Sequence, residues 1–414
     1  MSKTKSIMKK LAFIMAVVGP GIIAANADND AGGITTYSIV GAHFGLKMLW
    51  VLFLVTISLA ITQEMGVRIG VITRQGLGGI IRENFGVKWT AFAMCAMLIA
   101  NIGTITAEFA GVAASFSIFG ISKYIVVPLA ALVVWFILLK GSFRTTQKIF
   151  LVFSAFYIVY IINGFIIKPD FAQAAVALFT PTIEWTTPFL LTMIALIGTT
   201  ITPWGQFFIQ SYVVDKGLDI KHYKTEKAEV YIGAFITDIV SFFIIISTAA
   251  VLYKYGIHIS DAKDAALALR PLAGNLAQVL FAFGLFSASM LGAFILPTAT
   301  SYALCEAFGW ESGFNTTWKT GRIFYSIILF SIIIPVIFVL LPNISLIKIM
   351  ILSQDVNGIL LPFILIFVMK IINNKRIMGE HTNKPIGNFI AWATIIGIIG
   401  ATGVLVVTSV LGIN

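Results

Sequence analysis

Long apolar segments, separated by short polar ones, run along the full length of the chain. A helix needs roughly 20 mainly apolar residues to cross the hydrocarbon core of a bilayer. Eleven segments of the sequence have this character, and they lie near residues 8–40, 47–72, 89–117, 123–140, 149–167, 187–213, 229–253, 275–307, 323–341, 346–371 and 387–411. The pattern therefore predicts an all-α integral membrane protein with eleven transmembrane helices.

The polar segments between these spans are all short. The longest are 168–186, 214–228, 254–274, 309–321 and 372–386. None of them is long enough to bury a hydrophobic core of its own. We therefore expect residues 1–414 to form a single transmembrane domain whose chemistry lies within the helices.

Two of the spans are interrupted at corresponding places. The first contains GPGIIAANADNDAGG (Gly19–Gly33), and the sixth contains IGTTITPWGQ (Ile197–Gln206) with Pro203 in its middle. Glycine and proline disturb a regular helix at both places. Broken helices at equivalent positions of two five-span halves are typical of inverted-repeat secondary transporters, whose substrate site lies at the breaks.

This correspondence predicts a first inverted repeat over 1–167, a second over 187–371 and an extra helix over 387–411. Unwound backbone inside a bilayer leaves carbonyl oxygens that need a partner. A bound cation would satisfy them.

The composition supports a location in the membrane. Hydrophobic residues make up 58% of the chain and charged residues 11%, which is more apolar surface than a soluble core of this size can hide. Cys95 and Cys305 lie apart within spans, so neither a disulfide nor a zinc or iron–sulfur site is indicated. No cleavable signal peptide is evident, and the first span is expected to remain.

The net charge of +10 does not indicate nucleic-acid binding, because the basic residues are spread over alternate loops. They gather at the N-terminus and in 74–88, 140–148, 216–227, 319–322 and 370–384. Basic loops favour the cytoplasmic side of a membrane. We therefore predict a multi-pass protein of the cell membrane, with the N-terminus in the cytoplasm and the C-terminus outside. Its expected partner is the lipid bilayer, and no oligomeric partner is evident.

The first candidate ligand is Asp30, which lies with Asp28 at the expected centre of the bilayer. An ionised carboxylate there costs several kcal/mol unless a cation or strong donors meet it. Asp30 could instead cap the free amides of the following half-helix, and the two roles can coexist. Asp28 and Asn26 could line the access route or pair internally.

Hydroxyl groups surround the break in the sixth span, at Thr199, Thr200 and Thr202. A threonine in a membrane helix usually bonds to its own backbone. Thr202 is the strongest candidate of the three, because Pro203 removes an amide and opens the turn beside it. Trp204 could form a wall of the site or simply pack.

Other polar residues within the spans are candidates for a pathway or an internal network. Glu108 and Asp355 are acids without an obvious partner nearby in the sequence, as are Asp238 and Glu306. Glu64 and Arg68 lie four residues apart and could pair on one helix face.

The tenth span contains SQDVNG, where Gln354 and Asn357 offer neutral oxygens. The four histidines lie in loops or at span ends, so no histidine is expected deep in the membrane as a metal ligand or proton relay.

Several of these segments resemble the Nramp (natural resistance-associated macrophage protein) divalent-metal transporters, and most closely the Nramp-related magnesium transporters. The family's GPG and DPGN motifs are similar to Gly19-Pro20-Gly21 and to Asp30-Ala31-Gly32-Gly33 in the first span. The family's MPH triplet corresponds to Thr202-Pro203-Trp204 in the sixth span. Similar segments also occur at 41–45, 63–73, 107–111 and 353–354. The resemblance covers essentially the whole chain. It implies a LeuT/APC-type fold of two inverted five-helix repeats plus an eleventh helix, with helices 1 and 6 unwound.

The resemblance also implies a metal site. Asp30 matches the metal-binding aspartate, Ala27 and Thr199 match the positions whose backbone carbonyls bind, and Gln354 adds a neutral oxygen. The family's asparagine is replaced by Gly33 and its methionine, a soft sulfur donor, by Thr202. Hard cations prefer oxygen, and Mg²⁺ gives up its waters reluctantly. We therefore expect an all-oxygen site for partly hydrated Mg²⁺, with Mn²⁺ tolerated, as transported substrate and no cofactor.

The same comparison bears on proton coupling. The family's proton route involves an aspartate in span three and histidines in span six, and these positions read Ile105, Trp204 and Ile209. Glu108 is retained. The resemblance therefore implies import driven by the membrane potential without protons.

Three alternatives remain open at this stage. The chain could be a proton-coupled Mn²⁺ or Fe²⁺ importer of the ordinary Nramp type, or a sodium-coupled carrier of organic solutes on the same fold. An intramembrane enzyme is the third, although the sequence contains no HExxH or GxSxG motif.

Overall fold

The computed structural model describes residues 29–140, 158–313 and 317–411, and within these ranges the chain is helical without strands. The main helices are α3 (Ala31–Phe44), α4 (Leu49–Thr73), α5 (Leu77–Ser117), α6 (Lys123–Lys140), α8 (Ile158–Ile167), α10 (Thr187–Thr200), α11 (Pro203–Asp215), α12 (Tyr223–Val251), α15 (Ala277–Phe308), α16 (Arg322–Leu340), α17 (Leu346–Ile372) and α19 (Pro385–Leu411). Short helices lie in the polar segments between them: α9 (Phe171–Ala177), α13 (Ala262–Ala266), α14 (Arg270–Ala273) and α18 (Lys375–Met378).

Eight helices of the described chain, counting α10 and α11 together, are long and apolar enough to cross a membrane. Two shorter apolar helices, Lys123–Leu139 and Ile158–Ile167, add to them. The predicted spans match these helices closely. Much of the first span and of the span at 149–167 lies outside the described residues, so the structure tests only their second parts.

The third span, predicted to begin near residue 89, corresponds to the second of two helices that meet at a kink within α5, which as a whole begins at Leu77. Gly86 has φ of 79°, a left-handed conformation that glycine adopts without steric cost. The helix is therefore interrupted at Gly86, and a separate first part of α5, which starts at Leu77, precedes the predicted span.

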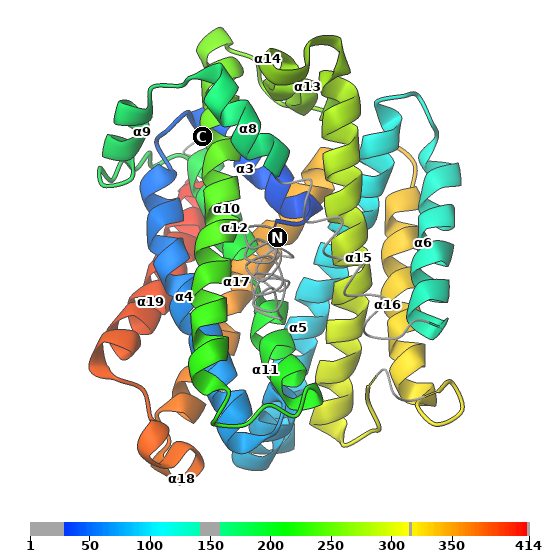
Figure 1. The fold of residues 1–414 in the computed structure, drawn as a ribbon, viewed down its shortest axis with the longest axis vertical. Coiled ribbons are helices and arrows are strands. Elements are labelled where there is room, and N and C mark those ends of the chain that lie inside the picture. The colour runs from blue at the N-terminus through cyan, green and yellow to red at the C-terminus, as the bar shows by residue number, and fades with distance from the viewer. Residues whose placement is uncertain (1–28, 141–157, 314–316, 412–414) are drawn as a thin grey trace, which may run out of the picture.

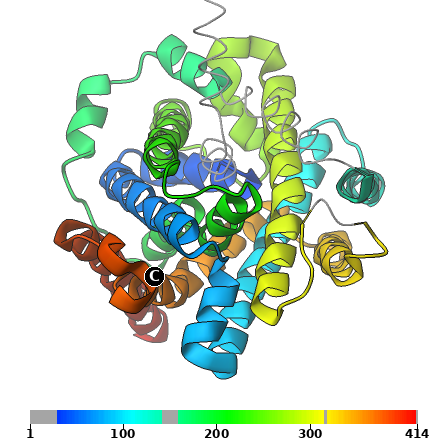
Figure 2. The same ribbon diagram turned by 60° about the horizontal axis from the view of Figure 1, so that its bottom comes forward.

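The half-helix α3 lies at the centre of the bundle (Figures 1 and 2). It packs against α12, α10, α17 and α5. α5 runs between α15 and α17, while α6 and α16 cover the outside of that layer, and α19 packs on α17, α10 and α4. The centre of the molecule is thus formed by the elements that flank the two predicted breaks.

Close helix contacts depend on small residues, as is usual in membranes. A β-carbon on Gly41 of α3 would stand 2.3 Å from the carbonyl oxygen of Ile245 in α12. The backbones of α3 and α12 therefore touch, which holds the central half-helix against its neighbour.

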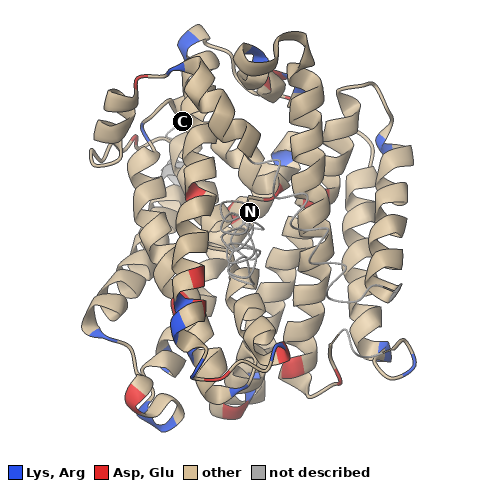
Figure 3. Cartoon of the chain, in the orientation of Figure 1, with Lys and Arg blue, Asp and Glu red and all other residues tan. Residues whose placement is uncertain are grey.

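The outer helices present apolar side chains to the surroundings. Leu129 and Phe136 of α6, Phe330 and Ile337 of α16, and Phe389 of α19 are all more than half exposed. Charged residues concentrate at the two ends of the bundle, and the band between them holds only a few (Figure 3). This distribution fits a protein surrounded by lipid.

Candidate functional site

The sixth span is broken between α10 and α11, as predicted. Two residues at the break have extended backbone. Ile201 has φ −117° and ψ 95°, and Thr202 has φ −89° and ψ 143°. Pro203 then occupies the first turn of α11. The Thr202 hydroxyl accepts a hydrogen bond from the amide of Gly205 at 3.3 Å, so this side chain caps the new helix.

The break frees the carbonyl of Thr199. In an α-helix this oxygen would accept from the amide four residues later, but that residue is Pro203, which has no N–H. The Thr199 hydroxyl is also buried without a hydrogen-bond partner. Both oxygens of Thr199 are therefore available at the break.

Asp30 begins the central half-helix. Its Oδ1 accepts from the amide of Gly33 at 2.6 Å, so the capping role considered for Asp30 is present in the structure. The side chain is buried. A helix N-terminus carries partial positive charge, which favours a carboxylate there.

A second buried acid, Glu108 of α5, meets the same turn. Its Oε2 accepts from the amide of Ala31 at 3.4 Å, and its carboxyl group lies against that of Asp30. The other oxygen, Oε1, is buried without a partner. Two ionised carboxylates in contact repel strongly in a low-dielectric interior, so a proton or a cation is needed to stabilise them.

Gln354 of α17 lies on the other side of this turn. A β-carbon on Gly32 would stand 1.9 Å from its Nε2. The Gln354 Oε1 accepts from Asn357 Nδ2 at 2.9 Å, and Asn357 also donates to the Thr104 hydroxyl at 2.9 Å. Gln354 thus joins Asp30 and Glu108 around the first turn of α3, and Asn357 holds the Gln354 side chain in place through its hydrogen bond.

The remaining predicted positions differ in what the structure says of them. Asn26, Ala27 and Asp28 lie outside the described residues. Gly33 lies in the first turn of α3, where its amide is used by Asp30. Asp355 follows Gln354 on α17 and is buried with one oxygen unpartnered.

Trp204 is almost fully buried, and its ring centroid lies 5.9 Å from that of Phe208. Its indole N–H has no partner. Both roles considered for Trp204, a wall of the site or packing, are compatible with this position.

The expected pair of Glu64 and Arg68 is present, with 3.0 Å between Arg68 Nη2 and Glu64 Oε2. Arg68 also donates to the carbonyls of His381 and Thr382. This pair joins α4 to the segment before α19, which is a structural role.

Sequence analysis missed Asn29, which anchors the start of α3. Its Nδ2 donates to the carbonyl of Thr237 at 3.1 Å, and its Oδ1 accepts from Ser241 at 3.0 Å. It also missed three buried glutamines, Gln63, Gln206 and Gln210. The last two follow Thr202 at four-residue steps, and this spacing was the available signal.

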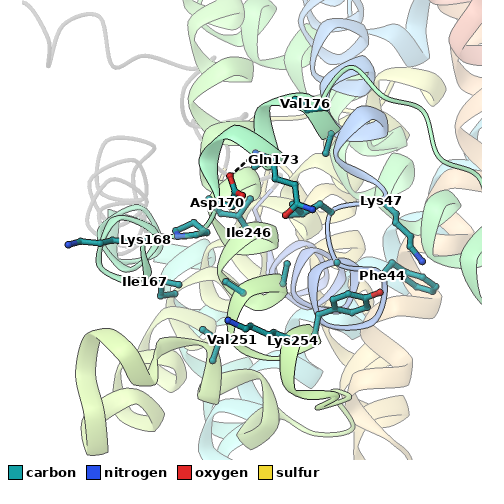
Figure 4. A pocket seen from close by; sticks show the side chains of 18 of the residues that line it. Phe44, Lys47, Ile167, Lys168, Asp170, Gln173, Val176, Ile246, Val251 and Lys254 are labelled. Atoms are coloured by element: carbon teal, nitrogen blue, oxygen red, sulfur yellow. Dashed lines mark hydrogen bonds between the residues drawn. The ribbon is translucent and has the colours of Figure 1, made fainter.

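A cavity of about 1070 Å³ lies elsewhere, between the C-terminal end of α3, the α8–α9 segment and the end of α12 (Figure 4). Lys47, Lys168 and Lys254 are among its lining residues, as are Asp170 and Gln173. No residue of the group around Asp30 lines it. Its positive charge disfavours a cation, so it is distinct from the candidate site.

The candidate site is therefore built mainly from single oxygen donors of different kinds. Within the described ranges no three His, Cys, Asp or Glu side chains gather as a metal-binding group. The carboxylates of Asp30 and Glu108, the amide of Gln354 and the oxygens of Thr199 instead belong to elements that pack together, namely the start of α3, α5, α17 and α10. Such donors suit a hard divalent cation.

Comparisons with known proteins agree with this architecture. A family model described as natural resistance-associated macrophage protein-like matches residues 21–408. The divalent metal cation transporter MntH of Caldanaerobacter subterraneus is 25% identical over 97% of this chain and 94% of its own. MntH of Bacillus subtilis is 25% identical over 95% of this chain and 92% of its own.

Solved structures show the same fold. A manganese transporter from Eremococcus coleocola matches with a TM-score of 0.74 and 18% identity, over 94% of this chain and 85% of its own. MhsT in complex with L-phenylalanine matches with a TM-score of 0.61 and 14% identity, over 92% of this chain and 98% of its own. At these identities the likeness concerns the fold alone.

Proposed function

Because the chain belongs to the Nramp family of natural resistance-associated macrophage protein-like proteins, we propose that it is a divalent metal ion transporter of the cell membrane. In this proposal it imports Mg²⁺, with Mn²⁺ as a second substrate, by alternating access and without coupled protons. It would then stand with the Nramp-related magnesium transporters within the family.

The observation that carries this proposal is the set of oxygen donors around the first turn of α3. Asp30 supplies one carboxylate, and Thr199 supplies a carbonyl that Pro203 leaves without an amide partner. Gln354 borders the same turn. The sulfur of Met350, in α17, is not free to act as a donor, because its Sδ accepts a hydrogen bond from the Thr35 hydroxyl. Hard ions such as Mg²⁺ and Mn²⁺ prefer these oxygens to sulfur.

The absence of proton coupling is proposed from three buried side chains. Ile105 and Ile209 are buried and cannot carry a proton, and Trp204 packs in the interior. An inward membrane potential supplies about 4.6 kcal/mol per 100 mV for a divalent ion, twice the value for a single charge. This driving force suffices for uptake.

We propose that the alternating-access movement takes place between the two predicted inverted repeats. The repeats at 1–167 and 187–371 would rearrange around the two breaks, with the N-terminus in the cytoplasm and the C-terminus outside. The described residues of the site are buried, so these movements would have to open a route to them.

One observation favours a second candidate, a proton-coupled Mn²⁺ or Fe²⁺ importer. The carboxyl groups of Asp30 and Glu108 are in contact, and such a pair can exchange a proton for a cation. The two candidates differ in whether protons accompany the metal.

Uptake by purified protein in liposomes tests both. The liposomes contain a dye for Mg²⁺ or Mn²⁺ and a pH dye, and a potassium gradient with valinomycin sets the potential. We expect metal uptake to increase with an inside-negative potential while internal pH stays constant. Internal acidification during metal entry would support the second candidate, and no divalent metal uptake would refute both.

A further inference from the structure

Two glutamines of α11 have buried amide groups without partners, and a third glutamine, in α4, has one unpartnered oxygen. Gln206 and Gln210 are fully buried, and neither the Oε1 nor the Nε2 of either side chain makes a hydrogen bond. The Oε1 of Gln63 is also buried without a partner. Among the described residues, Gln206 and Gln210 are the side-chain amides with both atoms unpartnered.

These side chains form a row that begins at the break. Thr202, Gln206 and Gln210 follow one another at four-residue steps, so they share a face of α11 and lie about 6 Å apart along its axis. A β-carbon on Gly205 would stand 3.3 Å from Gln63 Nε2. Gln63 of α4 therefore lies against Gly205, the residue that directly precedes Gln206 on α11.

A second contact between the two helices involves Gln210. A β-carbon on Gly66 of α4 would stand 2.5 Å from Ile209 Cγ2 and 3.8 Å from Gln210 Cγ. Gln210 thus lies beside the α4–α11 contact, and Gln206, one turn earlier on the same face of α11, is buried in the interior of the bundle.

Such a row is costly if it only fills space. A buried polar group without a partner destabilises the folded protein, and a leucine or methionine would fill a similar volume without that cost. Elsewhere in the bundle buried amides do find partners: Gln354 bonds Asn357, and Asn29 bonds Ser241. The missing partner of the row is therefore expected to be something that this structure does not contain.

We propose that Gln206, Gln210 and Gln63 form a transient binding station for the partly hydrated divalent cation between the central site and the far end of α11. This inference rests on the proposed transport of such a cation. The amide oxygens would accept hydrogen bonds from the waters that the ion retains, or would bind it directly.

Neutral amides suit a station of this kind. A site on a transport pathway has to bind strongly enough to admit the ion and weakly enough to release it. A carboxylate in the row would hold a divalent ion more tightly. Next to Gln210, Ser211 donates to the carboxyl group of Glu306 at 2.9 Å, so an acid lies close to the end of the row.

The test replaces the amides with leucine, in a Gln206→Leu/Gln210→Leu variant and separately in Gln63→Leu. Gln278→Leu is the matched control, because Gln278 is exposed on α15. Liposome uptake of Mg²⁺ and Mn²⁺ gives kcat and KM, calorimetry gives equilibrium binding at the central site, and thermal unfolding in detergent reports folding.

We expect the double variant to lose at least tenfold in kcat, while equilibrium affinity changes less than about threefold and thermal stability is maintained or raised. Gln206→Met/Gln210→Met, which is unbranched like glutamine, replaces it if the leucine variant does not fold. Unchanged kcat in a folded double variant refutes the station and leaves the proposed function intact. Absence of divalent uptake by the unaltered protein refutes the proposed function itself, and the station with it.

Discussion

Gly198 of α10 and Gln354 of α17 touch through their backbones: a β-carbon on Gly198 would stand 2.2 Å from the carbonyl oxygen of Gln354. The amide of Gly358 would be only 2.3 Å away. Gly198 directly precedes Thr199, whose carbonyl is freed at the break. The contact therefore sets the distance between two of the proposed oxygen donors.

Gly198→Ala is expected to destabilise the protein and to impair uptake. The added methyl group meets backbone, which cannot move aside, so α10 and α17 have to separate at a cost of about 1–3 kcal/mol or more. Thermal unfolding in detergent measures the loss. Gly400→Ala in α19 is the matched control, because a β-carbon there meets nothing within 4 Å. Equal melting temperatures for the two variants would contradict the packing argument.

Gly32→Ala is expected to act on the cation rather than on the fold. Its β-carbon would meet the end of the flexible Gln354 side chain, which can swing away and leave the first turn of α3. We expect weaker Mg²⁺ binding by calorimetry with little change in melting temperature. Because both changes remove the same contact, Gly32→Ala and Gln354→Ala should be non-additive in the double variant. Full additivity would separate Gln354 from the site.

Arg68→Leu should be one of the most destabilising single changes in α4. It leaves the buried carboxylate of Glu64 without its cation, which typically costs about 3–5 kcal/mol. Adding Glu64→Gln removes that charge and should recover part of the loss. The recovery of stability should be incomplete, because Arg68 also donates hydrogen bonds to the carbonyls of His381 and Thr382. Denaturation of the two single variants and the double variant measures the coupling, and additive effects would argue against a stabilising ion pair.

The sequence was sufficient to predict the helices and the break before Pro203, because apolar length and proline chemistry are local properties. The capping role of Asp30 was also readable, since it depends on the residues that follow it. The contacts of Gln354 with Gly32 and of Glu108 with Ala31 depend on how distant spans pack. No local pattern reports that packing. Gln206 and Gln210 were overlooked because two amides hardly alter the apolar character of their span.

Asp30→Asn should abolish metal uptake while the protein remains folded. Asparagine caps a helix about as well as aspartate, so the bond to the Gly33 amide can be kept while the negative charge is lost. Asp30→Ala removes both the cap and the charge and should be less stable by about 1 kcal/mol. Uptake and thermal unfolding of both variants separate the two roles. Uptake retained by Asp30→Asn would remove the carboxylate from the cation site.

Thr202→Met should shift the selectivity of the site from hard towards soft cations. Methionine would place a polarisable sulfur at the break, where Cd²⁺ or Fe²⁺ gains a favourable ligand and Mg²⁺ loses oxygen. The change also removes the cap that Thr202 provides to the Gly205 amide, at a cost of about 0.5–2 kcal/mol. Thr202→Leu is the control, since it loses the same cap without adding sulfur. Calorimetry with Cd²⁺ and Mg²⁺ should show tighter Cd²⁺ binding in the methionine variant alone. If the leucine and methionine variants bind Cd²⁺ equally, residue 202 does not contact the ion, and the proposed preference for Mg²⁺ would need another origin.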